Sequence, residues 1–292
     1  MRVRKAVFPA AGWGTRFLPA TKAQPKEMLP LVDKPIIQYG VEEAVAAGIE
    51  QIIIVTSTHK GAIEDHFDLN YELEHLLEEK GEIEKLRQVR AITDLAQLAY
   101  VRQKEQLGLG HAVLMAKDLI GHEPFAVILP DDVCIGERPV IGQLIHAYHQ
   151  THGSVVAVME VPPEETSRYG VIASEPTEDP LDHGRLHRVT RLVEKPAPKD
   201  APSNLGIIGR YVLTPKIFDK LEQTQRGAGG EIQLTDAIQA LMEEQQVFAY
   251  EFEGIRYDAG TTVGWLKASV ELALQRPDIG PEFRTYLSEL QL

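Results

Sequence analysis

The sequence predicts an α/β fold with a mixed, mainly parallel central sheet that is flanked by helices. Strand-like and helix-like segments alternate through the first half of the chain, and such alternation produces parallel strands with helices on both faces of the sheet. Residues 51–57 (QIIIVTS) form a continuous run rich in β-branched residues, which is typical of a strand buried on both sides. The polar motifs directly follow predicted strands. This placement is typical of Rossmann-like sheets, whose ligands bind at the carboxyl ends of the strands.

The first half of the chain contains four predicted strands with helices between them. The strands are expected at residues 5–9, 51–57, 99–103 and 125–129. Residues 35–48 fit a helix, because their apolar side chains share one face and Gly48 follows as a stop. Residues 111–120 fit a second helix, so the order of the elements is the βαβαβ repeat of a parallel sheet.

Residues 65–97 interrupt this alternation with a highly charged stretch whose leucines recur near helical spacing. We expect a solvated helical excursion that caps one edge of the sheet. The alternative is that its leucines pack against another subunit.

The second half of the chain is richer in strands. They are expected at residues 154–161, 169–174, 188–194, 205–213 and 247–252. The expected helices cover residues 215–221, 231–244, 263–275 and 281–290. Residues 175–186 are polar and contain two prolines and a glycine, which predicts a surface hairpin or loop. The sequence has no internal repeat and no low-complexity linker, so a single domain spanning residues 1–292 is expected.

Composition and charge exclude several classes of function. The chain of 292 residues has a net charge of −13, which argues against nucleic acid and anionic membranes as partners, since both require basic surfaces. A single cysteine, Cys134, excludes an intrachain disulfide framework and a cysteine-rich zinc site. We find neither a targeting segment nor an apolar run long enough to span a bilayer, so the cytoplasm is the expected location.

Residues 8–35 (FPAAGWGTRFLPATKAQPKEMLPLVDKP) carry the most informative motif. Gly12 and Gly14 follow a short apolar strand, and glycines let a backbone turn tightly while its N–H groups stay exposed. Arg16 and Lys26 come next, on a segment that three prolines stiffen. In an acidic chain, such a local cluster of cations indicates a polyphosphate ligand.

Two other phosphate-binding motifs are excluded. A dinucleotide-binding fingerprint requires a third glycine where this chain has Phe17, and Pro19 forbids a regular helix interior just beyond it. A P-loop requires Gly-Lys-Ser/Thr, which follows neither Gly12 nor Gly14.

The motif resembles the signature of the sugar-1-phosphate nucleotidylyltransferases, and in detail that of the bacterial UTP–glucose-1-phosphate uridylyltransferases, also called UDP-glucose pyrophosphorylases. Residues 25–30 (PKEMLP) match that family residue for residue, and the resemblance extends from Lys5 to about Gly264. It implies the nucleotide-diphospho-sugar transferase fold. It also implies that UTP and α-D-glucose 1-phosphate are converted to UDP-glucose and pyrophosphate, with Mg²⁺ as the cofactor. Relatives form dimers or tetramers, so a homodimer or homotetramer is expected.

The resemblance also assigns roles within the single domain. Residues 1–135 would form mainly the nucleotide-binding half, residues 136–264 mainly the sugar-phosphate-binding half, and residues 265–292 a C-terminal helical segment. The implied nucleotide-binding residues are Ala11, Gly12, Gly14, Thr15, Gln103 and Gly108. The implied catalytic residues are Arg16, Lys26 and Lys195. The implied sugar-phosphate-binding residues are Gly170, Glu194, Lys195 and Asn204, and the implied metal ligands are Asp131 and Asp258.

These residue types suit an in-line displacement at phosphorus, in which the protein supplies mainly backbone donors, cations and a metal ion. Carboxylates such as those of Asp131 and Asp258 are the hard oxygen ligands that Mg²⁺ prefers. Asp132 either assists them or caps the turn that follows. The amide of Gln103 both donates and accepts hydrogen bonds, which fits the edge of uracil. The ammonium of Lys195 suits the 1-phosphate of the sugar.

Two alternative functions remain open at this point. One is another hexose-1-phosphate nucleotidylyltransferase that uses dTTP, CTP or ATP. Residues 227–236 (GAGGEIQLTD) match the uridylyltransferases, although most of them carry Asp where this chain has Gly230. The other alternative is a non-catalytic nucleotide-sugar sensor on the same scaffold, and the joint presence of the cations and aspartates argues against it.

A histidine triplet resembles a metal-binding stripe. His146, His149 and His152 recur every third residue, but that spacing drifts around a helix instead of holding one face. We therefore interpret them as residues of a surface helix.

Overall fold

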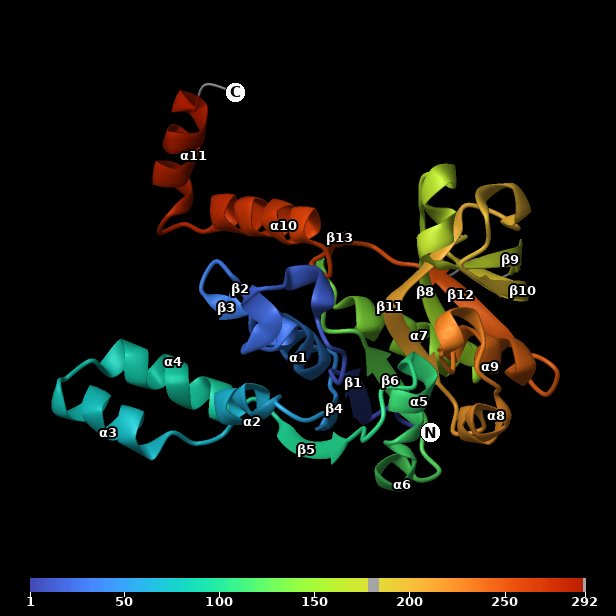
Figure 1. Ribbon diagram of the computed structural model, residues 1–292, viewed down its shortest axis with the longest axis horizontal. Coiled ribbons are helices and arrows are strands. Elements are labelled where there is room, and N and C mark those ends of the chain that lie inside the picture. Colours follow the sequence, from blue (N-terminus) through green and yellow to red (C-terminus); the bar gives the residue numbers. More distant parts are fainter. Residues whose placement is uncertain (178–183, 291–292) are drawn as a thin grey trace.

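The computed structural model describes residues 1–177 and 184–290, and its main feature is a central sheet covered by helices on both faces (Figure 1). The strands of this sheet are β1 (Lys5–Pro9), β4 (Gln51–Thr56), β5 (Gln97–Arg102), β6 (Phe125–Ile128), β8 (Ser154–Glu160), β9 (Gly170–Pro176), β10 (Leu186–Glu194), β11 (Leu205–Leu213) and β12 (Val247–Glu251). Their spatial order is β5-β4-β1-β6-β11-β8-β12-β10-β9.

The direction of the strands confirms the predicted sheet. Strands β5, β4, β1 and β6 pair in parallel, as do β12 and β8. Strand β11 is antiparallel to β6 and β8, and β10 is antiparallel to β12 and β9. Among the described strands of this sheet, only β10 and β11 therefore run against the others, and the sheet is mixed but mainly parallel.

Two small antiparallel pairs lie outside the main sheet, and the sequence did not predict them. Strand β2 (Pro30–Leu31) pairs with β3 (Lys34–Pro35). Strand β7 (Asp132–Ile135) pairs with β13 (Ile255–Asp258), and Asp258 lies opposite Asp132 in their register. The second pair brings two acidic segments together that are far apart in the sequence.

The helices follow the predicted order with small shifts at their ends. They are α1 (Ile36–Ala46), α2 (Gly61–Phe67), α3 (Tyr71–Glu79), α4 (Ile83–Thr93), α5 (Leu109–Leu114), α6 (Lys117–Ile120), α7 (Val140–Thr151), α8 (Ile217–Gln223), α9 (Leu234–Leu241), α10 (Thr262–Gln275) and α11 (Gly280–Glu289). The continuous helix expected over residues 111–120 is divided into α5 and α6. The backbone tightens there, because the N–H of Ala116 donates to the carbonyl of Val113 instead of continuing the α-helical pattern. Within the described residues, every helix is too short or too polar to cross a bilayer.

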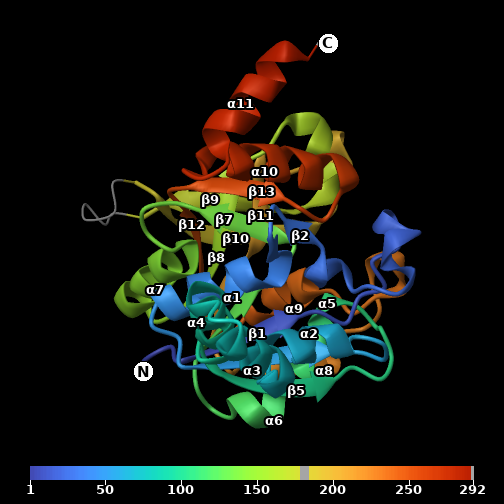
Figure 2. The same cartoon turned by 90° about the vertical axis from the view of Figure 1, so that its left-hand side faces the viewer.

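Each face of the main sheet has its own apolar core, as the alternation of side chains along a strand requires. Helices α1, α2 and α7 cover one face, where Phe8 and Ile54 are fully buried. Helices α5, α6, α8 and α9 cover the other face, where Val7 and Val127 are fully buried. A third, smaller core joins α10 to the small strand pairs, and Figure 2 shows α10 beside β13 with α11 extending beyond it.

The charged stretch over residues 65–97 is helical, as predicted. Helices α3 and α4 form a hairpin that projects away from the body of the protein (Figure 1). Leu86 is buried in this hairpin, whereas Leu73 and Leu76 are exposed. Of the loop expected over residues 175–186, the part from 178 to 183 lies outside the described residues.

A buried ion pair ties the two halves of the sheet together. Arg210 on β11 is fully buried, and its Nη2 lies 2.7 Å from Oε2 of Glu43 on α1. The same guanidinium donates to the backbone carbonyls of Leu129 at 3.2 Å and Asp132 at 2.7 Å. Glu43 also accepts the N–H of Ile141, at the start of α7, at 2.8 Å. One pair of charges thus fixes α1, α7, β11 and the turn that follows β6.

We expect Arg210→Met to lower the free energy of unfolding by about 3–5 kcal/mol, because it leaves a buried carboxylate and two carbonyls without their donor. The loss should be visible as a lower urea midpoint. The double variant with Glu43→Met should recover part of it, since the uncompensated charge is then removed. Arg87→Met, in an exposed pair with Glu84, is the control and should change stability by less than about 0.5 kcal/mol. A loss at position 210 as small as that at position 87 would contradict the prediction.

Candidate active site

Two adjacent cavities open at the carboxyl ends of the strands. The larger has a volume of about 730 Å³ and the smaller about 520 Å³, which are ordinary sizes for small-molecule sites. The residues that line both cavities are Arg16, Leu109, Leu129, Asp131 and Glu231. A ligand that spans both cavities would therefore have its middle beside Arg16 and Asp131.

The smaller cavity is lined by the glycine loop that follows β1. All six predicted nucleotide-binding residues line it, namely Ala11, Gly12, Gly14, Thr15, Gln103 and Gly108. Gly14 has a φ of 66°, a conformation that residues with side chains rarely adopt, and Thr21 Oγ1 donates to its carbonyl at 2.8 Å. Ser57, after β4, donates to the carbonyl of Ala11 at 2.9 Å. These contacts fix the path of the loop.

Gln103 and Gly108 form the far wall of the smaller cavity. The Gln103 side chain is buried, and its Nε2 lies 3.2 Å from the carbonyl of Gly108 and 2.8 Å from Nδ1 of His111. Burial lowers the pKa of His111, which favours a neutral ring whose Nδ1 can accept this hydrogen bond. The N–H of Ile232 donates to the carbonyl of Leu107 at 2.7 Å. The run over residues 227–236 therefore supports this wall from behind.

A lysine–aspartate pair lies where the cavities meet. Lys26 Nζ is 2.6 Å from Oδ2 of Asp131, and both side chains are about three-quarters buried. Burial opposes the charge of Lys26, but the Asp131 carboxylate, aided by Glu27, outweighs it and keeps the pKa of Lys26 above its ordinary value. Burial likewise opposes the charge of Asp131, yet Lys26 holds the pKa of this carboxyl below its usual range. Both groups are therefore charged at neutral pH.

Asp258 lies beside this pair because of the turn that follows β13. A Cβ added to Gly260 would lie 2.8 Å from Oδ2 of Asp131 and 3.2 Å from Oδ1 of Asp258, so both carboxylates converge on this glycine. The N–H of Gly260 donates to Asp258 Oδ1 at 3.1 Å, and Arg16 Nη1 donates to the Gly260 carbonyl at 3.3 Å. The predicted catalytic residues Arg16 and Lys26 thus meet the two predicted metal ligands at one place.

The chemistry of this donor set fits a divalent ion. The described residues contain no group of three or more His, Cys, Asp or Glu side chains that could hold a metal. Mg²⁺ is usually held by one or two carboxylates together with substrate phosphates and water, and the two carboxylates of Asp131 and Asp258 match that number of protein ligands.

The larger cavity contains most of the predicted sugar-phosphate site. Gly170, Glu194 and Lys195 line it, together with Tyr169. Lys195 has a φ of 46°, and its N–H donates to the carbonyl of Tyr169 at 2.9 Å. A Cβ on Gly170 would lie 3.2 Å from Glu194 Oε2, so the glycine allows this close approach.

Asn204 is the predicted site residue that the structure does not bring to either cavity. It is exposed, it does not line the cavities, and its carbonyl accepts the N–H of Val161 at 2.9 Å. Its assignment came from the position of its segment, which does reach the cavity further on, at Ile207 to Gly209.

Comparison with known proteins identifies the family. Residues 5–275 match the profile of the family described as nucleotidyl transferase. A UTP–glucose-1-phosphate uridylyltransferase of Staphylococcus epidermidis is 56% identical over 292 residues, which cover 100% of this chain and 99% of that protein. The chain belongs to this uridylyltransferase family.

Solved structures of the family share the fold. A UDP-glucose pyrophosphorylase complexed with UDP-glucose has a TM-score of 0.85 and 47% identity, and the match covers 94% of this chain and 100% of that one. A UTP-bound UGPase from Acinetobacter baumannii has a TM-score of 0.90 and 43% identity, and the match covers 99% of this chain and 100% of that one. The predicted nucleotide-diphospho-sugar transferase fold is confirmed, and nucleotidyltransferases of this kind generally use a divalent metal ion.

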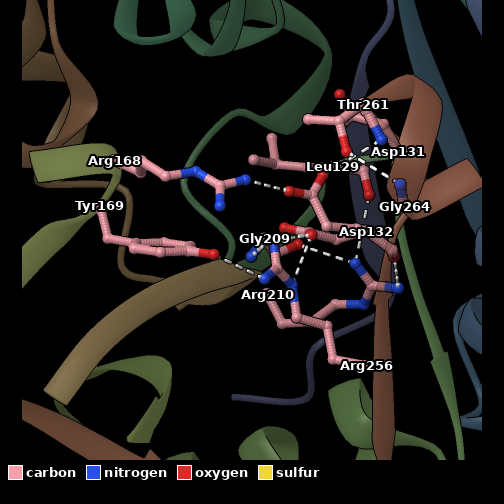
Figure 3. A network of polar contacts seen from close by, with 12 residues as sticks. Leu129, Asp131, Asp132, Arg168, Tyr169, Gly209, Arg210, Arg256, Thr261 and Gly264 are labelled. Atoms are coloured by element: carbon pink, nitrogen blue, oxygen red, sulfur yellow. Dashed lines mark hydrogen bonds and ion pairs between the residues drawn. The ribbon is translucent and has the colours of Figure 1, made fainter. Parts of the chain in front are cut away.

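Two arginines that line the larger cavity, Arg168 and Arg256, were not predicted as site residues from the sequence. Arg168 Nη2 lies 2.8 Å from Asp258 Oδ2 (Figure 3). Arg256 is mostly buried, donates to Asp132 and donates to the hydroxyl of Tyr169 at 3.0 Å. Each arginine lies two positions before a predicted site residue, since Arg168 precedes Gly170 and Arg256 precedes Asp258. This adjacency was the available signal, but it does not tell which way an arginine points.

Asp132 and the histidine triplet have plain structural explanations. Asp132 Oδ2 accepts the N–H of Gly209 at 2.9 Å and its other oxygen pairs with Arg256, so its carboxylate joins β7 to β11 and β13 instead of capping the turn that follows it. His146 and His149 are exposed on α7, and His152 is the left-handed residue that ends it.

We expect Gly108→Ala to disrupt the nucleotide side of the site. Gly108 has a φ of 105°, and an added Cβ would lie 2.6 Å from the Glu231 Cβ and 3.0 Å from the Ile232 carbonyl oxygen. The loop must therefore move, which should raise the KM for UTP about tenfold or more and lower stability by about 1–3 kcal/mol. Steady-state kinetics and thermal melting would measure both effects. Gly61→Ala, at the first residue of α2 with nothing within 4 Å, is the control and should leave both unchanged or slightly stabilise the chain.

Proposed function

We propose that the chain transfers UMP from UTP to α-D-glucose 1-phosphate and so produces UDP-glucose and pyrophosphate, with Mg²⁺ as its divalent ion. The observation that carries the proposal is the meeting of the two cavities at Arg16, Lys26, Asp131 and Asp258. A nucleotide in one cavity and a sugar phosphate in the other would bring their phosphates together at this junction. The relatives solved with UTP and with UDP-glucose support UTP as a substrate and UDP-glucose as the product.

On the nucleotide side, the chain would supply backbone and amide groups. The loop over residues 11–15 would direct N–H groups at the triphosphate. Gly12 has no Cβ, and the position that a Cβ would take has no atom within 4 Å, which leaves room for phosphate oxygens. Gln103 would face the uracil edge, beside the backbone of Gly108. Because other bases present other donor and acceptor patterns, this wall favours UTP over ATP and CTP.

At the junction, the protein would act mainly through charge. Arg16 and Lys26 would neutralise the β- and γ-phosphates and the charge that develops on the α-phosphate during displacement. Both are held in place by partners before the substrate arrives, Arg16 by the Gly260 carbonyl and Lys26 by Asp131. Mg²⁺ held by Asp131 and Asp258 would shield the same phosphates.

On the sugar side, Glu194 would accept hydrogen bonds from the hexose hydroxyls and Lys195 would bind the 1-phosphate. Gly170 would let the backbone approach the ring. The assignment divides the single domain into a nucleotide half at residues 1–135, a sugar-phosphate half at residues 136–264 and a helical segment at residues 265–292. A homodimer or homotetramer, a cytoplasmic location and a part for Asn204 in the sugar site stay predictions.

The proposed reaction is tested by pyrophosphate release from the purified chain with glucose 1-phosphate, Mg²⁺ and each of UTP, dTTP, CTP and ATP. We expect release with UTP at a rate at least about tenfold above that with CTP or ATP, since mispaired buried polar groups weaken the binding of the wrong base. A preference for dTTP, CTP or ATP would favour another nucleotidylyltransferase. Binding of UDP-glucose without any pyrophosphate release would instead favour a sensor.

We expect Lys195→Ala to raise the KM for glucose 1-phosphate about tenfold or more, because a charge-assisted hydrogen bond to phosphate is worth about 1.5–3 kcal/mol. The KM for UTP should change less than about twofold, since Lys195 lines only the larger cavity. Lys199→Ala, at an exposed lysine outside both cavities, serves as the matched control. An equal rise in both KM values would show that Lys195 has no specific part in the sugar site.

A further inference from the structure

The ion pair between Arg168 and Asp258 is one of the ion pairs that line the larger cavity. It joins the connection before β9 to the end of β13, and both of its residues line the cavity. Arg168 Nη2 lies 2.8 Å from Asp258 Oδ2, and Nη1 lies 3.0 Å from Glu165 Oε2. Oδ1 of Asp258 already accepts the N–H of Gly260. The guanidinium therefore neutralises the oxygen of Asp258 that is not used by the backbone.

We propose that Arg168 takes the place of the divalent ion at Asp258 in the substrate-free chain, and that metal binding releases it to bind the 1-phosphate of the sugar. The inference rests on the proposed function, in which Asp258 is a metal ligand. It makes Arg168 a phosphate-positioning residue and couples the binding of the metal to the binding of the second substrate.

The exposure of the pair allows this exchange. The side chain of Arg168 is 45% exposed and that of Asp258 25%, so water solvates both charges when they separate. Arg256, which lies nearby, is the contrasting case. Its side chain and that of Asp132 are each 10% exposed, and Tyr169 also holds it. Arg256 is fixed, whereas Arg168 is able to move.

The surroundings of Arg168 indicate where the released guanidinium would bind, namely at a phosphate in the larger cavity. Arg168 and Lys195 both line the larger cavity, and Tyr169 links them, since its carbonyl accepts the Lys195 N–H at 2.9 Å and its ring lies 5.7 Å from the Arg168 guanidinium. A divalent cation at Asp258 would repel the guanidinium. A phosphate in the cavity would attract it, and the planar donors of arginine suit phosphate oxygens.

This exchange predicts effects of opposite sign, which distinguishes it from a structural role. Removing the guanidinium removes a competitor for Asp258, so metal binding in the absence of substrates should become tighter. The same change removes a phosphate ligand, so sugar phosphate should bind more weakly. A side chain that only supported the fold would weaken both.

The test is Arg168→Gln, with Arg87→Gln as the matched control because it removes an exposed arginine of an ion pair on α4, far from the cavities. Mn²⁺ is the probe, and its free concentration is followed by electron paramagnetic resonance without substrates. We expect Arg168→Gln to bind Mn²⁺ about two- to fivefold more tightly than the unchanged chain, which is the factor that an exposed ion pair contributes. Arg87→Gln should bind it as the unchanged chain does.

The second measurement is steady-state kinetics. Arg168→Gln should raise the KM for glucose 1-phosphate about tenfold, while the KM for UTP stays within about twofold. Mn²⁺ affinity that is unchanged, weaker or undetectable in Arg168→Gln would overturn the inference, and so would an unchanged KM for the sugar phosphate. Measurements on Asp258→Asn distinguish a failure of the inference about Arg168 from a failure of the proposed function. If Asp258→Asn bound Mn²⁺ as tightly as the unchanged chain, the assignment of Asp258 as a metal ligand would be wrong. If the unchanged chain made no UDP-glucose, the proposed reaction itself would be wrong.

Discussion

The buried charge of Arg210 is the constraint on which the geometry of the site depends. Its guanidinium donates to the carbonyls of Leu129 and Asp132, which lie on either side of Asp131, and Glu43 balances its charge from α1. Apolar residues in the same space would often give equal or greater stability, but they would leave these carbonyls without donors. The ion pair therefore fixes the position of a turn. That turn presents Asp131 to Lys26 at the edge of the sheet.

Further charged contacts fix the residues between this turn and the cavities. Asp132 lines the larger cavity, but both of its carboxylate oxygens are engaged, one by Arg256 and the other by the Gly209 N–H. Gly260 lies between Asp131 and Asp258, and its carbonyl accepts from Arg16. Groups that are fixed before the reaction stabilise developing charge without the rearrangement that water would need. In an acidic chain, this local arrangement of cations is what makes a site for polyphosphate possible.

The sequence predicted local features well and long-range contacts poorly. The strand at Gln51–Thr56 was evident because its run of β-branched residues is continuous. The placement of Gly12, Gln103 and Asp131 after strands followed from the topology of parallel sheets. The pairing of β7 with β13 and the contact between Glu43 and Arg210 join residues that are more than one hundred positions apart, and no periodicity indicates such partners. Asn204 shows a related limit. A matching segment indicates where the chain passes, but the direction of each side chain depends on neighbours that the segment does not contain.

An acidic protein that binds phosphates cannot leave several cations unpaired at one place, because their mutual repulsion would destabilise the folded state. Here three of the cations that line the larger cavity have carboxylate partners, since Lys195 has Glu194, Arg256 has Asp132, and Arg168 has Asp258 and Glu165. The fourth, Arg16, donates to the carbonyl of Gly260. A phosphate must compete with these carboxylates for the N–H donors of the cations. A cation therefore binds phosphate most strongly where its ion pair is most solvated and separates most easily. The exposure of an ion pair therefore indicates the function of its cation. Buried pairs such as Arg210 with Glu43 maintain the framework, and half-exposed pairs such as Arg168 with Asp258 are available for exchange with a ligand.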